Sequence, residues 1–146
     1  RRIMAKKKVA AKIACDTNVF INIGLKDKAT IEALQQIGNK NILIPIISAI
    51  ELCKGSGNKN ELKKTIDFIN LYANLQLNKK GVDLGLEFIK KYHLSHGLDL
   101  ADALIASSVV VATGVKLFTF NVKDFDYIKG LKLYYPPTIS KIKRKK

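Results

Sequence analysis

The sequence lacks the features that mark membrane, secreted and metal-thiolate proteins. No apolar run in its 146 residues is long enough to span a bilayer, and no apolar segment with a cleavage site follows the basic N-terminus. Its two cysteines, Cys15 and Cys53, lie in apolar segments at a spacing unlike C-x-x-C, so we expect buried, reduced thiols and no zinc site. These absences favour a soluble, cytoplasmic protein without a membrane partner.

Acidic residues are also scarce, with twelve against 26 lysines and arginines, and the formal net charge is +14. Six basic side chains lie in residues 1–12 and five in residues 141–146, and neither stretch holds an acid. We therefore expect a basic N-terminal arm at 1–12, with Met4 as the natural start, a single domain at 13–138 and a basic C-terminal tail at 139–146. Such ends are either solvated arms that aid solubility or arms that add contacts to nucleic-acid phosphates, and contacts of the second kind weaken steeply with salt.

Apolar patterning predicts short strands that alternate with helices. The expected strands are Ile13 to Asp16, Asn41 to Pro45, Leu75 to Leu77, Lys116 to Thr119 and Leu131 to Tyr134. The expected helices are Asp27 to Ile37, a short one from Ser48 to about Gly55, Asn60 to Ala73, Gly81 to Tyr92 and Asp99 to Thr113, with His93 and His96 in a loop. This order predicts an α/β fold with three α/β/α layers and a mainly parallel central sheet of four or five strands.

The few acids fall where predicted strands pass into helices. Asp16 ends the first strand, and Glu51 lies early in the helix after the second. Asp99 and Asp102 begin the most apolar helix, and Asp124 follows the strand after it. Because the carboxyl ends of parallel strands share one edge of a sheet, where ligands bind in open α/β folds, we expect these acids to form one site.

Clustered carboxylates repel one another unless a cation neutralises them, and hard divalent cations prefer oxygen ligands. Since no set of His or Cys ligands accompanies the acids, the expected ion is Mg²⁺ or Mn²⁺, which can activate water for attack on a phosphodiester. A structural alternative remains, because Ser48-x-x-Glu51 fits a helix capping box, Asp99-x-x-Asp102 resembles one, and Asp16 can cap the segment that follows it. The two roles are compatible.

Four motifs, in this order, resemble those of PIN-domain ribonucleases, and they are most similar to VapC-type toxins of toxin–antitoxin pairs. They are Asp16-Thr17-Asn18, Ser48-x-x-Glu51, Asp102-Ala103-Leu104-Ile105-Ala106 and the run from Leu117 to Phe125. The resemblance covers Ile13 to about Pro136. It implies a PIN-like fold, a Mg²⁺- or Mn²⁺-dependent endoribonuclease with an RNA substrate, a small antitoxin partner and a homodimer. Part of the region 60–92 would make the dimer and antitoxin contacts.

The resemblance also implies roles for single residues. Three acids match the catalytic, metal-binding set of the family: Asp16, Glu51 and Asp102. The fourth acidic position of the family falls on Asn121, so Asp124, one helical turn later, and Asp99, on the same helix face as Asp102, are further candidate metal ligands. Five polar residues would orient the carboxylates or water: Thr17, Asn18, Ser48, Thr119 and Asn121.

Other functions remain open at the level of sequence. A PIN nuclease that processes RNA without an antitoxin shares every motif, and Asn121 in place of an acid allows a PIN-fold RNA-binding module with an incomplete site. Two other α/β folds with acidic sites fit less well. A haloacid-dehalogenase-type phosphatase needs a second Asp where this chain has Asn18. A response-regulator receiver needs an upstream acidic pair and a late lysine, and neither pattern is clear.

Overall fold

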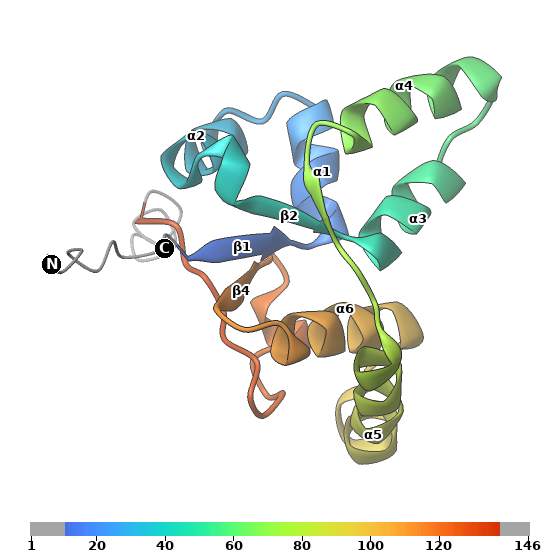
Figure 1. The fold of residues 1–146 in the computed structure, drawn as a ribbon, viewed down its shortest axis with the longest axis vertical. Coiled ribbons are helices and arrows are strands. Elements are labelled where there is room, and N and C mark those ends of the chain that lie inside the picture. The colour runs from blue at the N-terminus through green and yellow to red at the C-terminus, as the bar shows by residue number, and fades with distance from the viewer. Residues whose placement is uncertain (1–10, 138–146) are drawn as a thin grey trace, which may run out of the picture.

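The computed structural model describes residues 11–137 and has a parallel β-sheet at its centre (Figure 1). The strands lie in the order β3-β2-β1-β4, with bounds Ala73–Leu75, Ile42–Pro45, Lys12–Cys15 and Val115–Phe118. Each neighbouring pair is parallel. The prediction of a mainly parallel sheet of four or five strands is confirmed, with four strands.

The first strand occupies the middle of the sheet. Ile13 is in register with Ile42 of β2 on one side and with Lys116 of β4 on the other. Ile13, Ala14 and Cys15 are all buried, as expected for a parallel strand that is covered on both faces. The short strand β3 is mostly exposed and forms one edge of the sheet.

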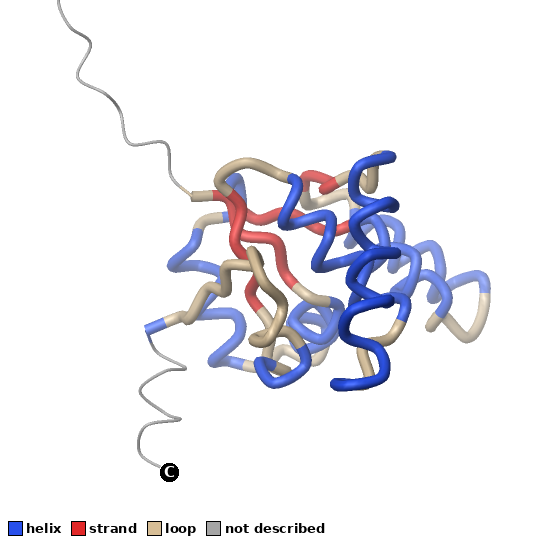
Figure 2. The backbone as a smooth tube through the Cα atoms, turned by 90° about the horizontal axis from the view of Figure 1, so that it is seen from below, coloured by secondary structure: helices blue, strands red, loops and turns tan. Residues whose placement is uncertain are grey.

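Helices cover both faces of the sheet, which makes the predicted three layers (Figures 1 and 2). The α-helices are α1 Thr17–Gly24, α2 Lys28–Ile37, α3 Ile46–Lys54, α4 Lys59–Ile69, α5 Lys79–His96 and α6 Leu100–Val111. Two 3₁₀ turns, η1 Asn39–Asn41 and η2 Val122–Asp124, complete the regular elements of the described residues. On one face α1, α2 and α4 pack with Ile13 and Cys15, and on the other α5 and α6 pack with Ala14.

Side-chain size decides how closely neighbouring helices on one face of the sheet approach each other. On the α1 face, the rings of Phe20, Phe68 and Tyr72 meet edge to face with centroids 5.2–6.2 Å apart, an arrangement that favours contact beyond simple burial. On the other face, a Cβ atom at Gly85 of α5 would lie 2.8 Å from Cδ2 of Leu104 in α6. The missing side chain therefore lets α5 lie close against α6.

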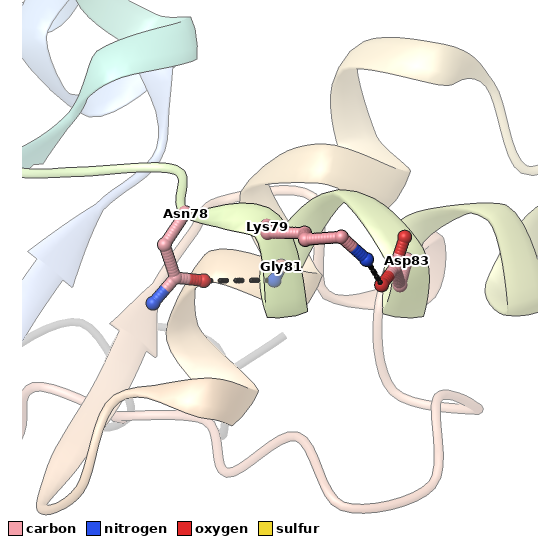
Figure 3. Close-up of polar contacts among 4 residues, drawn as sticks. All are labelled: Asn78, Lys79, Gly81 and Asp83. Atoms are coloured by element: carbon pink, nitrogen blue, oxygen red, sulfur yellow. Dashed lines mark hydrogen bonds and ion pairs between the residues drawn. The ribbon is translucent and has the colours of Figure 1, made fainter.

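Short polar residues begin five of the helices. Side-chain oxygens of the residue before the helix accept a backbone N–H at Asp16, Asp27, Asn58, Asn78 and Asp99. At α5, Oδ1 of Asn78 accepts the N–H of Gly81 at 2.9 Å, and an exposed ion pair joins Lys79, the first residue of the helix, to Asp83 one turn later (Figure 3). Each such cap contributes about 0.5–2 kcal/mol to helix stability.

The structure corrects several predicted boundaries. The helix predicted to reach Ala73 ends at Ile69, and the strand predicted at 75–77 lies at 73–75. Between them the N–H groups of Leu71 and Tyr72 bond to the carbonyls of Phe68 and Ile69, so the chain leaves the helix through a tight turn. The last predicted strand, 131–134, is reduced to one parallel bridge between Leu133 and Leu117. Gly130 at φ 90 precedes this segment and Pro136 follows it closely, so only a short stretch can pair.

The predicted loop around His93 and His96 is also wrong. Both residues belong to the last turn of α5, which ends at Gly97 in the left-handed conformation (φ 71). Between residues 11 and 137, no helix is both long and apolar enough to cross a membrane. The predicted basic arm and tail lie outside the described residues, except for Ala11 and Lys12.

Candidate active site

Asp16 lies at the carboxyl end of the central strand and is 5% exposed. Its Oδ1 accepts the N–H of Thr17 at 2.7 Å, and its Oδ2 accepts the hydroxyl of Thr119 at 3.0 Å. Its own N–H donates to the carbonyl of Phe118 at 2.9 Å. Asp16 is therefore both the N-cap of α1 and a fixed carboxylate at the junction of β1 with β4, so the capping and ligand interpretations coexist in one residue.

Thr119 links Asp16 to the loop after β4. It is 5% exposed, and its Oγ1 also accepts the N–H of Asn121 at 3.0 Å. This bond fixes the backbone of Asn121, whose side chain is exposed. Asn18, predicted to support the site, lies exposed in the first turn of α1.

Glu51 is held from α1 across the site. The hydroxyl of Thr17 donates to Oε1 of Glu51 at 2.6 Å and lies 3.0 Å from the hydroxyl oxygen of Ser48. Since a hydroxyl has one proton and the carboxylate is the stronger acceptor, Thr17 gives its proton to Glu51, and the Ser48 hydroxyl is free to donate back to Thr17. Three residues on two helices thus fix the direction of one carboxylate.

Ser48 is not the helix cap that its pattern with Glu51 predicted. The helix α3 begins two residues earlier, at Ile46, after Pro45, and no side chain caps it. Ser48 is instead fully buried on the inner face of α3. The helix follows β2 without a connecting loop, with Pro45 as both the last strand residue and the N-cap, so Ser48 is already the third helical residue.

Asp99 and Asp102 begin α6 as the pattern predicted. Oδ1 of Asp99 accepts the N–H of Asp102 at 2.9 Å, so Asp99 is the N-cap and Asp102 lies in the first turn. Asp99 is exposed, whereas Asp102 is partly buried. The positive end of the helix dipole favours a carboxylate at both positions.

The acids share one electrostatic neighbourhood. The pKa of the Asp102 carboxyl is raised to about 7, mainly by burial and then by four other carboxylates: Asp99, Asp16, Asp124 and Glu51. Burial also raises the pKa of Asp16, against the lowering effect of its hydrogen bonds to Thr119 and Thr17, and the charges of Glu51 and Asp124 raise it further. The structure thus places the other four predicted acids within electrostatic range of Asp102, and Glu51 and Asp124 within range of Asp16.

The donor set fits a hard divalent cation by its chemistry, because it consists of carboxylates whose repulsion such an ion would relieve. The carboxylates do not yet converge on one point. Throughout residues 11–137, no three His, Cys, Asp or Glu side chains are grouped closely enough to enclose a metal ion. Binding of a metal ion would therefore draw the carboxylate side chains toward a common point. Hydrogen bonds already hold Asp16 and Glu51 in place for this.

Tyr127 is a neighbour of the site that the sequence did not reveal. Burial raises the pKa of its hydroxyl, and the charge of Asp102, then those of Asp124 and other nearby acids, raise it further. Its ring stacks on His96 with centroids 3.9 Å apart and planes 10° apart. The spacing Asp124-x-x-Tyr127 was the only sequence signal, and it gained meaning only once the end of α5 was placed beside it.

Comparison with known proteins gives a family and a set of related folds. The sequence pattern of the PIN domain matches residues 13–131. Structural neighbours include a toxin–antitoxin complex from Klebsiella pneumoniae (TM-score 0.70, 20% identity, 86% of this chain and 98% of that one). DNA-bound VapBC from Salmonella typhimurium (0.69, 20%, 85% and 97%) and promoter-bound VapBC2 from Rickettsia felis (0.69, 24%, 84% and 96%) are equally similar. No curated protein is a significant sequence match.

Proposed function

The chain belongs to the PIN domain family of nucleases, and on that premise we propose that it is a Mg²⁺- or Mn²⁺-dependent endoribonuclease, the toxin of a type II toxin–antitoxin pair acting in the cytoplasm. One observation carries the proposal. Asp16, Glu51 and Asp102 come from three separate segments, yet Asp16 and Glu51 both raise the pKa of Asp102. A cluster that destabilises its own charged form is typical of a functional site.

In the proposed reaction, Asp16, Glu51 and Asp102 hold the metal ion, and Asp124 and Asp99 complete the negative surface around it. When bound, the ion would supply a water of lowered pKa and stabilise the leaving oxygen of the phosphodiester. The chain contributes rigid orientation. Thr119 fixes one oxygen of Asp16 and Thr17 fixes one oxygen of Glu51, which leaves the other Glu51 oxygen free for the ion.

A partner is favoured by an apolar cavity beside Glu51. The cavity holds about 620 Å³ between α1, α3 and α4, and its walls include Ile21 and Leu25, whose side chains are 43% and 75% exposed. An antitoxin segment with apolar side chains for this cavity and a cation for the carboxylates would neutralise the cluster and cover the cleft. The related structures named above include toxin–antitoxin complexes, which supports this choice of partner. A homodimer with contacts from part of the region 60–92 also belongs to the proposal.

Growth of a bacterial host tests the proposal in cells. Production of the chain alone should arrest growth, and Asp16→Asn should relieve the arrest while the protein remains folded. Harmless production of a folded, metal-loaded chain would favour an RNA-processing nuclease without an antitoxin.

Cleavage of RNA by the purified protein tests the chemistry directly. A fluorescently labelled RNA should be cut with Mn²⁺ present and left intact with a chelator, and Glu51→Gln should leave it intact in both conditions. Binding of RNA without cleavage at any Mn²⁺ concentration would instead favour an RNA-binding module.

A further inference from the structure

A second cavity lies at the amino ends of the sheet strands, opposite the carboxyl ends that carry the acids. It holds about 460 Å³ beside the amino ends of β1 and β4, which lie next to each other (Figure 1). Its floor and walls come from the end of α6, the turn at Thr113 and Gly114, and the segment after Gly130. A volume of this size is within the range of small-ligand sites.

The charges around this cavity are all positive. Lys12, Lys116 and Lys132 line it, and no acidic residue does. Lys12 donates one hydrogen bond to the carbonyl of Lys40 at 2.8 Å, which holds its ammonium at the rim and leaves its other protons available. Lys116 and Lys132 are exposed. The cavity therefore combines one ammonium group held by a hydrogen bond, that of Lys12, with two on exposed side chains, those of Lys116 and Lys132.

The remaining lining gives the cavity a second character. Val109, Val110 and Val115 add apolar surface to the same lining. An anion with an apolar face, such as a nucleotide of a single strand, matches both surfaces at once.

The proposed nuclease needs such a site. Its catalytic edge carries five carboxylates, and one divalent ion would offset only two of these charges, so cations elsewhere on the chain would add affinity for a polyanion. Lys12 begins β1 and Asp16 directly follows it, so the two ends of this buried strand are about 13 Å apart in a straight line at the rise of a β-strand. The path over the surface is longer than this, so only an RNA strand that extends several nucleotides from the cleavage point would connect the two ends.

We propose that the lysine-lined cavity at the amino edge of the sheet binds the phosphate backbone of the RNA substrate at a nucleotide several positions away from the scissile bond. The inference rests on the proposed function. It predicts that long substrates bind better than short ones, because only a long strand reaches both edges of the sheet.

A structural role for the lysines is the competing explanation. The cavity lies at the carboxyl end of α6, where cations stabilise the negative end of the helix dipole. In that case, replacing Lys116 and Lys132 should lower the melting temperature and leave RNA binding as it was. The two explanations are therefore separated by measuring stability and binding on the same variants.

The test compares Lys116→Gln/Lys132→Gln with Lys63→Gln/Lys80→Gln, a pair of exposed lysines on α4 and α5 with the same change in net charge. All proteins carry Asp16→Asn so that RNA stays intact, and binding is measured by fluorescence anisotropy across a salt series. With RNA of about twelve nucleotides, the cavity variant should bind about tenfold more weakly, with a salt slope reduced by about 1.4 for two lost phosphate contacts. The control pair should stay within about twofold, and a trinucleotide should distinguish the two variants far less.

Three outcomes would overturn the inference. They are equal losses of RNA binding in the two variants, no loss in the cavity variant, or a loss of inorganic phosphate binding in the cavity variant without a loss of RNA binding. The last outcome would assign the cavity to a small free anion. Failure of the proposed function is detected separately, by incubating the protein without Asp16→Asn with RNA and Mn²⁺. If cleavage is absent there and the binding pattern is as expected, the proposed nuclease function is wrong and the inference that the cavity binds RNA stands.

Discussion

The hydroxyl of Thr119 donates to Oδ2 of Asp16 at 3.0 Å, although 103 residues separate the two in the sequence. The bond joins the carboxyl ends of β4 and β1, and with the Thr17 N–H it occupies both oxygens of the carboxylate. Asp16 is thus oriented by protein groups alone. A carboxylate held in this way loses little conformational entropy when it takes up a ligand.

Removal of the Thr119 hydroxyl should loosen this orientation. We expect Thr119→Val to weaken Mn²⁺ binding by about 10–100-fold, the usual effect of losing a group that orients a metal ligand. Titration calorimetry with Mn²⁺ measures the effect, and Thr113→Val, at the opposite edge of the sheet, is the matched control. Equal affinities of the two variants would show that Asp16 needs no such support.

Substitutions at Asp16 separate its role as a ligand from its role as a cap. Asp16→Asn keeps a side-chain oxygen for the Thr17 N–H, so the free energy of unfolding should change little while RNA cleavage is lost. Asp16→Ala should lose cleavage and also about 0.5–2 kcal/mol of stability. Chemical denaturation and a cleavage assay on both variants measure this. An active Asp16→Asn protein would leave Asp16 as a cap only.

The raised pKa of Asp102 predicts a pH dependence of stability in metal-free protein. Its pKa is about 7 in the folded chain, mainly because of burial, against 3.8 as the ordinary value. Between these values the folded chain keeps a proton that the unfolded chain releases, so the free energy of unfolding falls as pH rises from about 4 to 7. One proton limits the slope to about 1.4 kcal/mol per pH unit.

Asp102→Asn should flatten that slope, whereas Asp126→Asn, an exposed acid near the same site, should keep most of it. Denaturant titrations at a series of pH values, in a metal-free buffer, measure both variants. Parallel curves for Asp102→Asn and the unaltered chain would mean that the Asp102 carboxyl ionises as freely as it does in the unfolded state.

Asp124 should matter more to metal binding than the residue at the family's fourth acidic position. Its charge raises the pKa of both Asp16 and Asp102, whereas Asn121 is neutral and exposed. We expect Asp124→Asn to weaken Mn²⁺ binding several-fold and Asn121→Ala to change it little. Parallel calorimetric titrations decide, and indistinguishable affinities would return Asp124 to the solvated surface.

The sequence predicted the parallel sheet and most helices, because each rests on a local pattern combined with one rule of topology. That five acids form one site stays a prediction, supported by the effect of four of them on the pKa of Asp102. Apolar strands such as Ile13 to Cys15 are easily recognised, and parallel strands necessarily place their carboxyl ends together. Ser48 shows the limit of local patterns. It fits a capping box by spacing, but α3 begins at Ile46, directly after the strand, and Ser48 is buried within its first turn.

Contacts between segments that are distant in the chain could not be predicted from the sequence. The stacking of Tyr127 on His96 depends on how the end of α5 meets the turn after β4, which no periodicity encodes. The predicted strand at 131–134 had the right composition but only one bridge to Leu117, since a turn at Gly130 and the prolines leave little length to pair. The lysine-lined cavity likewise required the ends of α6 and β4 to be placed together.

The span between Asp16 and Thr119 has a consequence for synthesis of the chain on the ribosome. A nascent chain that has emerged only as far as α5 contains Asp16 and Glu51, but neither Asp102 nor the Thr119 hydroxyl. Contacts between segments so distant in sequence form late, because the loop between them must close first. An incomplete chain therefore lacks the assembled carboxylate cluster. On the proposed function, the enzyme cannot cut the messenger that encodes it until translation has passed Thr119 and the segments that carry the acids have folded together.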